Sequence, residues 1–384
     1  MTSGTRAVAG TLLASLAASQ AALVVLNPVL PEIASDLDVS IATAGQLRTV
    51  SGLVAGTTAL GAGLLAARVG LRELLAAGLA VLALGSALSA LAPDFLLLAA
   101  AQALVGAGIG ISYSVAVAAV AEWTAPADRS RVLAVVLLGP PLAWIVGMPV
   151  VGLVGEASWR LAWIVVPLPP TLAAGAFLLR RPSTPPAEVR AGLRAVLRHP
   201  GVARWSAGEL LAFSGWAGAL VFMGALFVES YDLSIAATGF VLGFGALVYL
   251  PGNLLFRRWV DAHDRLLLVG LALGAAATVV VLGAVRPSVW VSIGLFSLLS
   301  FLAGGRTLAG SARSLHLAPA LRLGVTGVRT GALQLGYFVG AAVGGAALGA
   351  GGYTGLGIAL GALFLAATIP HLLPAVSDPS PPLP

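Results

Sequence analysis

Three separate fragments of this sequence recur about half a chain length further on. Residues 38–45 return as residues 232–239, a shift of 194 from Asp38 to Asp232. Residues 126–129 return as 319–322 and residues 142–147 as 335–340, both with a shift of 193. A duplicated apolar chain is typical of membrane proteins built from two helical bundles with a binding site between them. The repeat therefore indicates a membrane protein that moves a solute.

Composition agrees with lipid as the solvent of this chain. Of its 384 residues 59% are hydrophobic and 9% are charged, whereas soluble domains carry roughly 25% charged residues. The absence of cysteine excludes a disulfide framework, a thiolate nucleophile and a zinc ribbon. The net charge of +6 comes from arginines that lie between apolar runs, a pattern that favours membrane orientation over nucleic-acid binding.

Hydrophobic periodicity predicts an all-α integral membrane protein with twelve transmembrane helices. The predicted spans are 8–31, 43–66, 74–92, 95–121, 132–154, 161–179, 206–229, 236–256, 266–285, 288–311, 325–350 and 354–375. Residues 1–180 then form an N-terminal six-helix bundle and residues 206–384 a C-terminal one. Between them, residues 181–205 are a cytoplasmic linker, in which 187–198 could form a helix on the membrane surface.

The distribution of arginine predicts the sidedness. With a cytoplasmic amino terminus, seventeen arginines fall inside and only Arg160 and Arg286 fall outside, while Arg48 and Arg306 lie within spans. Positive charge accumulates on the cytoplasmic side of membrane proteins. We therefore expect a multi-pass protein of the bacterial plasma (inner) membrane with both termini cytoplasmic. Six spans in each half make the two repeats parallel.

Short motifs in the expected order carry a resemblance to a known family. The loop after the second span reads GLLAARVGLR and includes Gly63, Arg68, Gly70 and Arg72. Residues 27–33 read NPVLPEI, and GMPVVG at 147–152 is followed by Trp159 and Arg160. In these stretches the chain resembles the major facilitator superfamily, in particular its twelve-helix bacterial drug and sugar efflux branch. The resemblance implies two parallel six-helix repeats and alternating access.

Three departures from the family pattern weaken the expectation of proton antiport. Ala67 stands where the signature loop has aspartate, and Leu71 where it has arginine. Gln102 stands where proton-driven antiporters have an arginine in the fourth helix, and of the antiporter motif in the fifth helix only Gly139 and Pro140 remain. The resemblance therefore supports the fold more strongly than the coupling mechanism.

Two ionisable residues within spans are candidates for coupling or gating. An ionisable group in the bilayer is costly and needs a physical reason. Glu209 lies one turn into the seventh span and Arg306 near the end of the tenth, and the resemblance places both helices beside a central cavity. They could pair there as a cytoplasmic gate, bind a ligand directly, or extend to the interface from a helix end.

Neutral and aromatic side chains are the candidates for substrate binding. Phe213, Trp216 and Met223 follow Glu209 at helical spacing, and Gln20, Gln102 and Tyr113 lie on the first and fourth spans. Hydrogen-bonding groups between apolar walls suit an uncharged or amphipathic ligand. The same amides and hydroxyls could instead tie helices together.

Arg48 and a set of glycines complete the candidates. Arg48 lies one turn into the second span, where it could extend to the outer interface or pair with Glu229 or Asp232 as an outer gate. G-x-x-x-G spacings predict close helix contact, and the resemblance places their helices between the two bundles; ordinary packing within one bundle would explain the spacings equally well. These glycines are Gly52, Gly56, Gly336, Gly340 and Gly344.

Taken together, the residues favour a monomeric secondary transporter that exports a small hydrophobic or amphipathic molecule by alternating access, with protons as the coupling ion. Uptake or facilitated diffusion of a small solute, or a transporter fold recruited to a non-transport role, are the alternatives. The four histidines have no metal-ligand spacing, and no phosphate loop or nucleophile–base motif is present. We therefore expect no enzyme activity, metal, cofactor or nucleic-acid partner.

Overall fold

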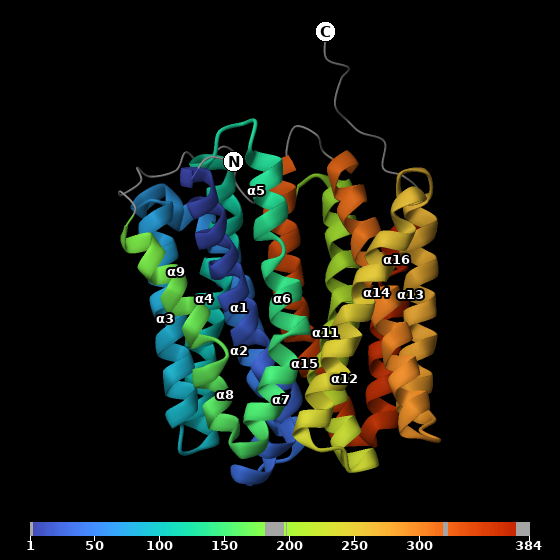
Figure 1. Ribbon diagram of the computed structural model, residues 1–384. Coiled ribbons are helices and arrows are strands. Elements are labelled where there is room, and N and C mark those ends of the chain that lie inside the picture. The colour runs from blue at the N-terminus through green and yellow to red at the C-terminus, as the bar shows by residue number, and fades with distance from the viewer. Residues whose placement is uncertain (1–2, 181–195, 197, 318–321, 374–384) are drawn as a thin grey trace.

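The computed structural model describes residues 3–180, 196, 198–317 and 322–373, which form a helical bundle. Figure 1 shows the helices running side by side between two ends, with the start of α1 and the end of α16 at the same end. We call this the terminal end. The N-terminal helices are α1 (Ser3–Asp36), α2 (Ile41–Val69), α3 (Leu71–Leu91), α4 (Phe95–Trp123), α5 (Arg129–Val136), α6 (Gly139–Ile145), α7 (Gly147–Ala157), α8 (Trp159–Val165) and α9 (Leu168–Leu179). The C-terminal helices are α11 (Pro200–Tyr231), α12 (Ile235–Leu255), α13 (Val260–Ala284), α14 (Val289–Leu317), α15 (Arg322–Ala366) and α16 (Ile369–Leu372).

The helix pattern agrees with the predicted membrane fold. Within the described ranges, ten segments are long and apolar enough to cross a membrane. The last of these, 327–372, contains two helices that meet at Gly351 and Gly352, where the backbone leaves helical geometry. The 29-residue α2 is not among the ten. If the two parts of α15 are counted separately and α2 is added, the number of spans is consistent with the twelve that the sequence predicts.

Proline explains why two predicted spans are built from short helices. The span at 132–154 consists of α5, α6 and α7, and the chain contains Pro140, Pro141 and Pro149 there. Pro167 separates α8 from α9. A proline lacks the N–H that the preceding turn would bind, so the helical ladder is interrupted. In contrast, α1 continues through Pro28 and Pro31 to Asp36, beyond its predicted end.

The sequence repeat has a matching repeat of local structure. Asp38 and Asp232 both adopt a left-handed backbone, with φ of 50° and 52°. Two residues later, Ser40 and Ser234 cap the next helix, each accepting a backbone N–H at 3.1 Å. A serine at this position satisfies one of the unpaired N–H groups of the first turn. The two halves therefore enter α2 and α12 by the same turn.

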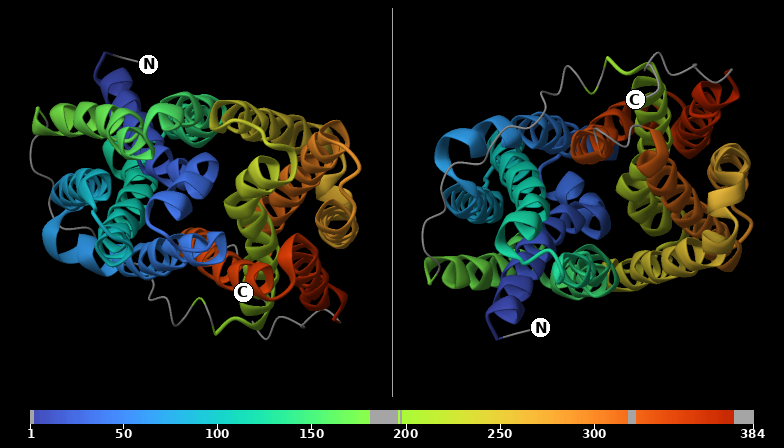
Figure 2. Two further views of the ribbon diagram at one scale, coloured as in Figure 1. Left: turned by 90° about the horizontal axis from the view of Figure 1, so that it is seen from below. Right: turned by 90° about the horizontal axis from the view of Figure 1, so that it is seen from above.

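The N-terminal and C-terminal helices lie on opposite sides of the molecule in both end-on views (Figure 2). Helices α2 and α15 pack across the boundary, as do α7 and α12, and α1 packs against α11. Gly152 of α7 meets Gly239 of α12 so closely that a Cβ added to Gly152 would lie 3.0 Å from the Gly239 Cα. Such contacts require glycine because any side chain would separate the helices.

Helix α11 begins before the predicted seventh span. Residues 200–205 belong to α11, which begins with Pro200 at its first position, where a missing N–H costs nothing. Most of the remaining linker lies outside the described residues, and of the predicted surface helix at 187–198 only residues 196 and 198 are described. The division of the chain into two bundles at these boundaries stays a prediction.

Candidate functional site

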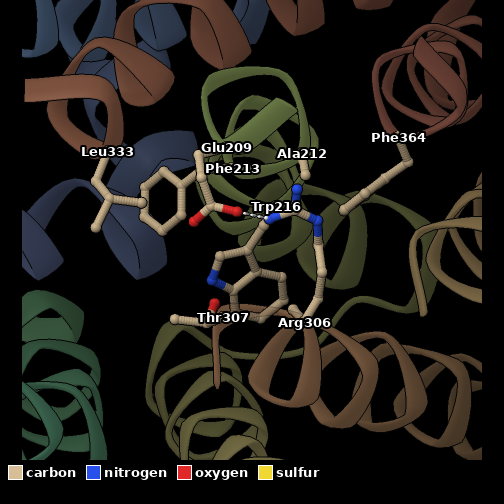
Figure 3. Close-up of a pocket in the computed structure, with 9 residues that line it drawn as sticks. Glu209, Ala212, Phe213, Trp216, Arg306, Thr307, Leu333 and Phe364 are labelled. Carbon is tan, nitrogen blue, oxygen red and sulfur yellow. Dashed lines mark hydrogen bonds and ion pairs between the residues drawn. The ribbon is translucent and has the colours of Figure 1, made fainter. Parts of the chain in front are cut away.

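A buried ion-pair cluster lies where α11, α14 and α15 meet. The carboxylate of Glu209 accepts a hydrogen bond from the Arg306 guanidinium at 2.5 Å and faces Arg329 at 3.6 Å. Glu209 is 1% exposed and Arg306 is 5% exposed. Figure 3 shows the Glu209 carboxylate directed at Arg306, close to the indole of Trp216. The expectation that both charges extend to the interface from helix ends is wrong, because the two side chains neutralise each other in the interior.

Backbone geometry makes room for this cluster. The Glu209 carboxylate occupies the space that a Cβ on Gly310 would fill. Arg306 Nη2 donates to the backbone carbonyl of Gly208 at 2.9 Å, and Trp205 Nε1 donates to that of Gly310 at 3.1 Å. These bonds satisfy both Nη atoms of Arg306, whereas Nε of Arg306 and Nε of Arg329 are buried without a hydrogen-bond acceptor among the described residues. Glycine at 310 is therefore part of the site.

The cluster lies entirely within the C-terminal helices. Glu209, Arg306 and Arg329 belong to α11, α14 and α15, and no ion pair among the described residues joins these helices to α1–α9. A gate between the two halves would need a contact across their boundary. The Glu209–Arg306 pair therefore cannot by itself hold the halves together.

Aromatic side chains form one wall of the pocket beside the cluster. Trp216 stacks on Tyr249 at 5.9 Å and on Phe296 at 6.2 Å. Phe213 meets the edge of Tyr337 at 5.3 Å. The pocket is lined by Glu209, Ala212, Phe213, Trp216, Ala303, Arg306, Thr307, Leu333 and Phe364. A charged pair beside aromatic rings can bind a molecule that has a polar group and an apolar body.

The predicted amides connect helices. Gln20 of α1 accepts a hydrogen bond from Trp144 Nε1 of α6 at 3.0 Å. Gln102 of α4 is fully buried and donates to Ser89 of α3 at 2.9 Å. Both bonds lie among the N-terminal helices, away from the ion-pair cluster. The structure thus supports a tie between helices for Gln102, and it places Gln20 in such a tie as well.

The remaining predicted binding residues have different surroundings. Phe213 and Trp216 line the pocket, as described. Met223 is 1% exposed and belongs to the hydrophobic core. Tyr113 of α4 is half-buried and packs against the same core.

Arg48 does not lie where either expectation placed it. Its side chain is 1% exposed, so it does not extend to the interface. Glu229 instead accepts a hydrogen bond from the Tyr353 hydroxyl at 2.5 Å, and Asp232 ends α11. Arg48 donates to the backbone carbonyl of Leu23 and lies 5.6 Å from the Tyr337 ring. Both sequence interpretations of Arg48 are therefore wrong.

The signature loop between α2 and α3 depends on one backbone conformation. Gly70 has φ 86° and ψ 156°, and its N–H bonds to the carbonyl of Ala66. After this turn, Arg72 donates to the Leu178 carbonyl at the end of α9 at 3.1 Å and pairs with Glu73 at 3.2 Å. Arg68 is exposed, and Gly63 is helical within α2. The loop therefore positions the start of α3 against α9.

Replacing Gly70 with alanine is expected to lower the stability of the protein by about 1–3 kcal/mol, because residues with a Cβ rarely adopt this conformation. Thermal unfolding of the purified protein in detergent measures the effect. Gly61→Ala in the preceding helix is the matched control, since a Cβ there meets nothing within 4 Å and alanine favours a helix. Equal melting temperatures for the two variants would contradict the role assigned to Gly70.

Sequence reasoning missed several residues at the site. Arg329 was assigned to the cytoplasmic side, yet it belongs to α15 and faces Glu209. Tyr249 stacks behind Trp216 of the pocket wall, and the ring of Tyr337 lies 5.6 Å from the Arg48 guanidinium. A polar aromatic residue inside an apolar span is a weak signal that could have indicated both tyrosines.

The described residues contain no group of three His, Asp or Glu side chains placed to hold a metal ion. What the site does contain is a buried charge cluster and an aromatic wall within a polytopic helical membrane protein. These features are typical of membrane proteins that conduct or transport solutes or ions, since ionisable groups inside such bundles mark the pathways of these molecules.

Comparison with known proteins identifies the family. The family model "Major Facilitator Superfamily" matches residues 12–262, and the chain belongs to this superfamily of membrane transporters. It is therefore a transporter and not an enzyme. A protein named "Probable sugar efflux transporter" from Pasteurella multocida (strain Pm70) is 27% identical over 350 residues, covering 87% of this chain and 83% of the relative.

Solved structures confirm the fold. A D-xylose–proton symporter superposes with a TM-score of 0.74 at 16% identity, covering 96% of this chain and 97% of the other. A bacterial homologue of the human lysosomal transporter Spinster, in an inward-facing and occupied conformation, also gives 0.74 at 16% identity, covering 97% of each chain. At these identities the likeness concerns the fold alone.

Proposed function

We propose that this protein is a secondary active transporter that exports a small amphipathic organic molecule by alternating access, coupled to proton entry. The observation that carries the proposal is the Glu209 carboxylate, buried against two arginines and directly beside the aromatic wall of the pocket. A carboxylate in this position can exchange an arginine for a proton when the substrate or the conformation changes.

The boundary between the two sets of helices supports alternating access. The described residues place close backbone contacts there, as at Gly152 with Gly239 and at Gly52 with Phe338. No ion pair between described residues crosses this boundary. Two rigid sets of helices can rock against each other at low cost when small residues, rather than paired charges, form the contact.

A sugar is the second candidate substrate. The printed name of the Pasteurella relative describes sugar efflux, and the stacked rings of Trp216 and Tyr249 offer a flat apolar surface of the kind that can also accept a sugar ring. The buried charges distinguish the candidates, because a neutral sugar leaves the charge of the pocket unchanged.

Flux through the purified protein in sealed proteoliposomes tests the proposal. The panel consists of sugars and of neutral, cationic and anionic amphipathic compounds, each measured with and without an imposed pH gradient. Export of an amphipathic compound driven by inward proton movement is the expected result. Sugar flux alone would favour the second candidate. Flux that does not depend on the pH gradient would contradict coupled export and indicate facilitated diffusion.

We also propose that the terminal end faces the cytoplasm of the bacterial cell. The native chain has no cysteine, so single cysteines report their own exposure. Ala157→Cys at the end of α7 is expected to react with a membrane-impermeant thiol reagent in intact cells. Ala127→Cys, in an exposed loop at the terminal end, should react only after permeabilisation. The reverse pattern would invert the topology.

A further inference from the structure

Arg48 is a buried cation for which the described chain supplies no anion. It is the eighth residue of α2, is 1% exposed, and is among the largest fully buried side chains. None of the ion pairs between described residues includes it. Burying a charge without a counter-ion is among the costliest arrangements in a protein interior. Such a residue inside a membrane protein needs a partner.

The contacts of Arg48 are all with neutral groups. Nη2 donates to the carbonyl of Leu23 and lies 3.5 Å from Oδ1 of Asn27, both on α1. The ring of Tyr337 on α15 lies 5.6 Å from the guanidinium. Nε and Nη1 of Arg48 and Nδ2 of Asn27 are buried without a hydrogen-bond acceptor in the described structure. All three of these atoms are donors, so what the site lacks is an acceptor.

Arg306 provides an internal comparison. It is buried to a similar degree, and Glu209 compensates its charge at 2.5 Å. The same fold thus supplies a carboxylate to one buried arginine and none to the other. Among the described residues, Arg48 therefore has no charged partner, whereas Arg306 has one.

The position of Arg48 also suits a ligand that passes between the two halves. Its neighbour Asn27 lies at their boundary, because the Asn27 backbone carbonyl occupies the place of a Cβ on Gly224 of α11. Tyr337 comes from the other half, and its edge contact with Phe213 joins the Arg48 surroundings to the pocket wall. Separation of these two rings would connect the pocket to Arg48.

We propose that Arg48 and Asn27 bind the carboxylate of the transported molecule, so that the substrate is an organic monoanion whose apolar body contacts Phe213 and Tyr337. The inference rests on the proposed function and names its substrate class. A carboxylate accepts the free N–H groups of Arg48 and Asn27 and neutralises the buried charge, which are the interactions that the site lacks. An inorganic monoanion shares this chemistry but has no body to contact the rings.

Ligand-dependent thermal stability of the purified protein in detergent tests the binding step without requiring transport. The probes are benzoate, phenylacetate, cinnamate and octanoate, each compared with its primary amide, and sodium nitrate as the inorganic monoanion. We expect at least one carboxylate to stabilise the protein saturably while its amide does not. Stabilisation by nitrate alone would contradict an organic substrate, and no difference between any acid and its amide would overturn the proposal.

Variants assign the effect to Arg48. Arg48→Gln is expected to weaken carboxylate binding about tenfold to a hundredfold, as the loss of a charge-assisted hydrogen bond predicts. Arg160→Gln, at a half-exposed pair with Asp36, is the control and should bind like the native protein. Unchanged carboxylate affinity in Arg48→Gln would contradict the assignment of the binding site to Arg48.

Asn27→Asp separates ligand binding from a structural role of Arg48. The introduced carboxylate supplies a permanent counter-ion, so the ligand-free melting temperature should rise while the stabilisation by added carboxylate disappears. If Arg48 serves only to hold α1 and α2 together, the response to carboxylate stays the same in this variant. Flux in proteoliposomes is measured separately, so that carboxylate binding without transport would reject the proposed function and retain the anion site.

Discussion

Glu209→Gln is expected to abolish transport driven by a pH gradient. Glutamine is close to glutamate in shape but carries no charge to exchange for a proton. The substitution also leaves Arg306 buried without a counter-ion, and breaking a buried pair in this way costs about 3–5 kcal/mol. We therefore expect a lower melting temperature together with loss of pH-driven flux. Undiminished pH-driven flux would remove Glu209 from the coupling mechanism.

A double variant distinguishes coupling from folding. Arg306→Gln together with Glu209→Gln removes both charges of the pair, and replacing a buried ion pair by neutral groups is often tolerated. This variant should regain much of the lost stability and still fail to couple flux to the pH gradient. Glu229→Gln is the matched control, because Glu229 bonds to Tyr353 at an exposed position at the end opposite the termini. It should transport normally.

The fold was predictable because lipid restricts what an apolar chain can form. Most predicted spans correspond to helices, and the predicted interruption at 351–352 is the break between the two parts of α15. Serine caps and left-handed aspartates recur at 194-residue spacing, so the duplication is visible both in sequence and in backbone. Periodicity, turn residues and repeats act locally, and a single sequence displays them directly.

Side-chain partners were less predictable because they depend on how helices are rotated. Pairing of Glu209 with Arg306 was one of three alternatives, but its second partner, Arg329, comes from α15 and lies 120 positions away in the chain. Arg48 looked like a residue near a helix end, yet α2 turns it inward toward α1. Rotating a helix by one residue turns it by about 100°, which can move a side chain from lipid to the interior. When the neighbouring residues of that side chain are small, the hydrophobic pattern hardly changes with the rotation. Because α2 contains many glycines and alanines, its sequence does not show which way the helix is rotated.

The structure also divides the predicted interface glycines into two groups. Gly52 and Gly56 of α2 meet Phe338 and Leu335 of α15 across the boundary between the halves. Gly336 and Gly340 instead pack against Phe213 and Ser214 of α11. Gly344 likewise lies against Phe222 of α11. Of the two interpretations, the boundary between the halves therefore fits the two glycines of α2, and packing within one bundle fits the three glycines of α15.

This division predicts opposite outcomes for two otherwise identical substitutions. In Gly52→Leu, a Cβ 2.6 Å from the Phe338 backbone nitrogen forces α2 and α15 apart. The variant should shift the equilibrium between conformations, and about 1.4 kcal/mol changes that ratio tenfold. In Gly340→Leu, the side chain collides with the backbone of α11 within one half, so overpacking should lower stability by about 1–3 kcal/mol or more. We therefore expect Gly52→Leu to lose flux with little loss of melting temperature, and Gly340→Leu to lose both together.

Gly294→Leu is the control for this comparison, because a Cβ at this exposed position of α14 meets nothing within 4 Å. Melting temperature, ligand affinity and flux are measured for each variant. If flux falls in proportion to stability in Gly52→Leu as well, the contact between α2 and α15 is ordinary packing. Separate loss of flux there would instead locate the motion between the halves at this contact, since only a boundary that must change during transport is sensitive to spacing without unfolding.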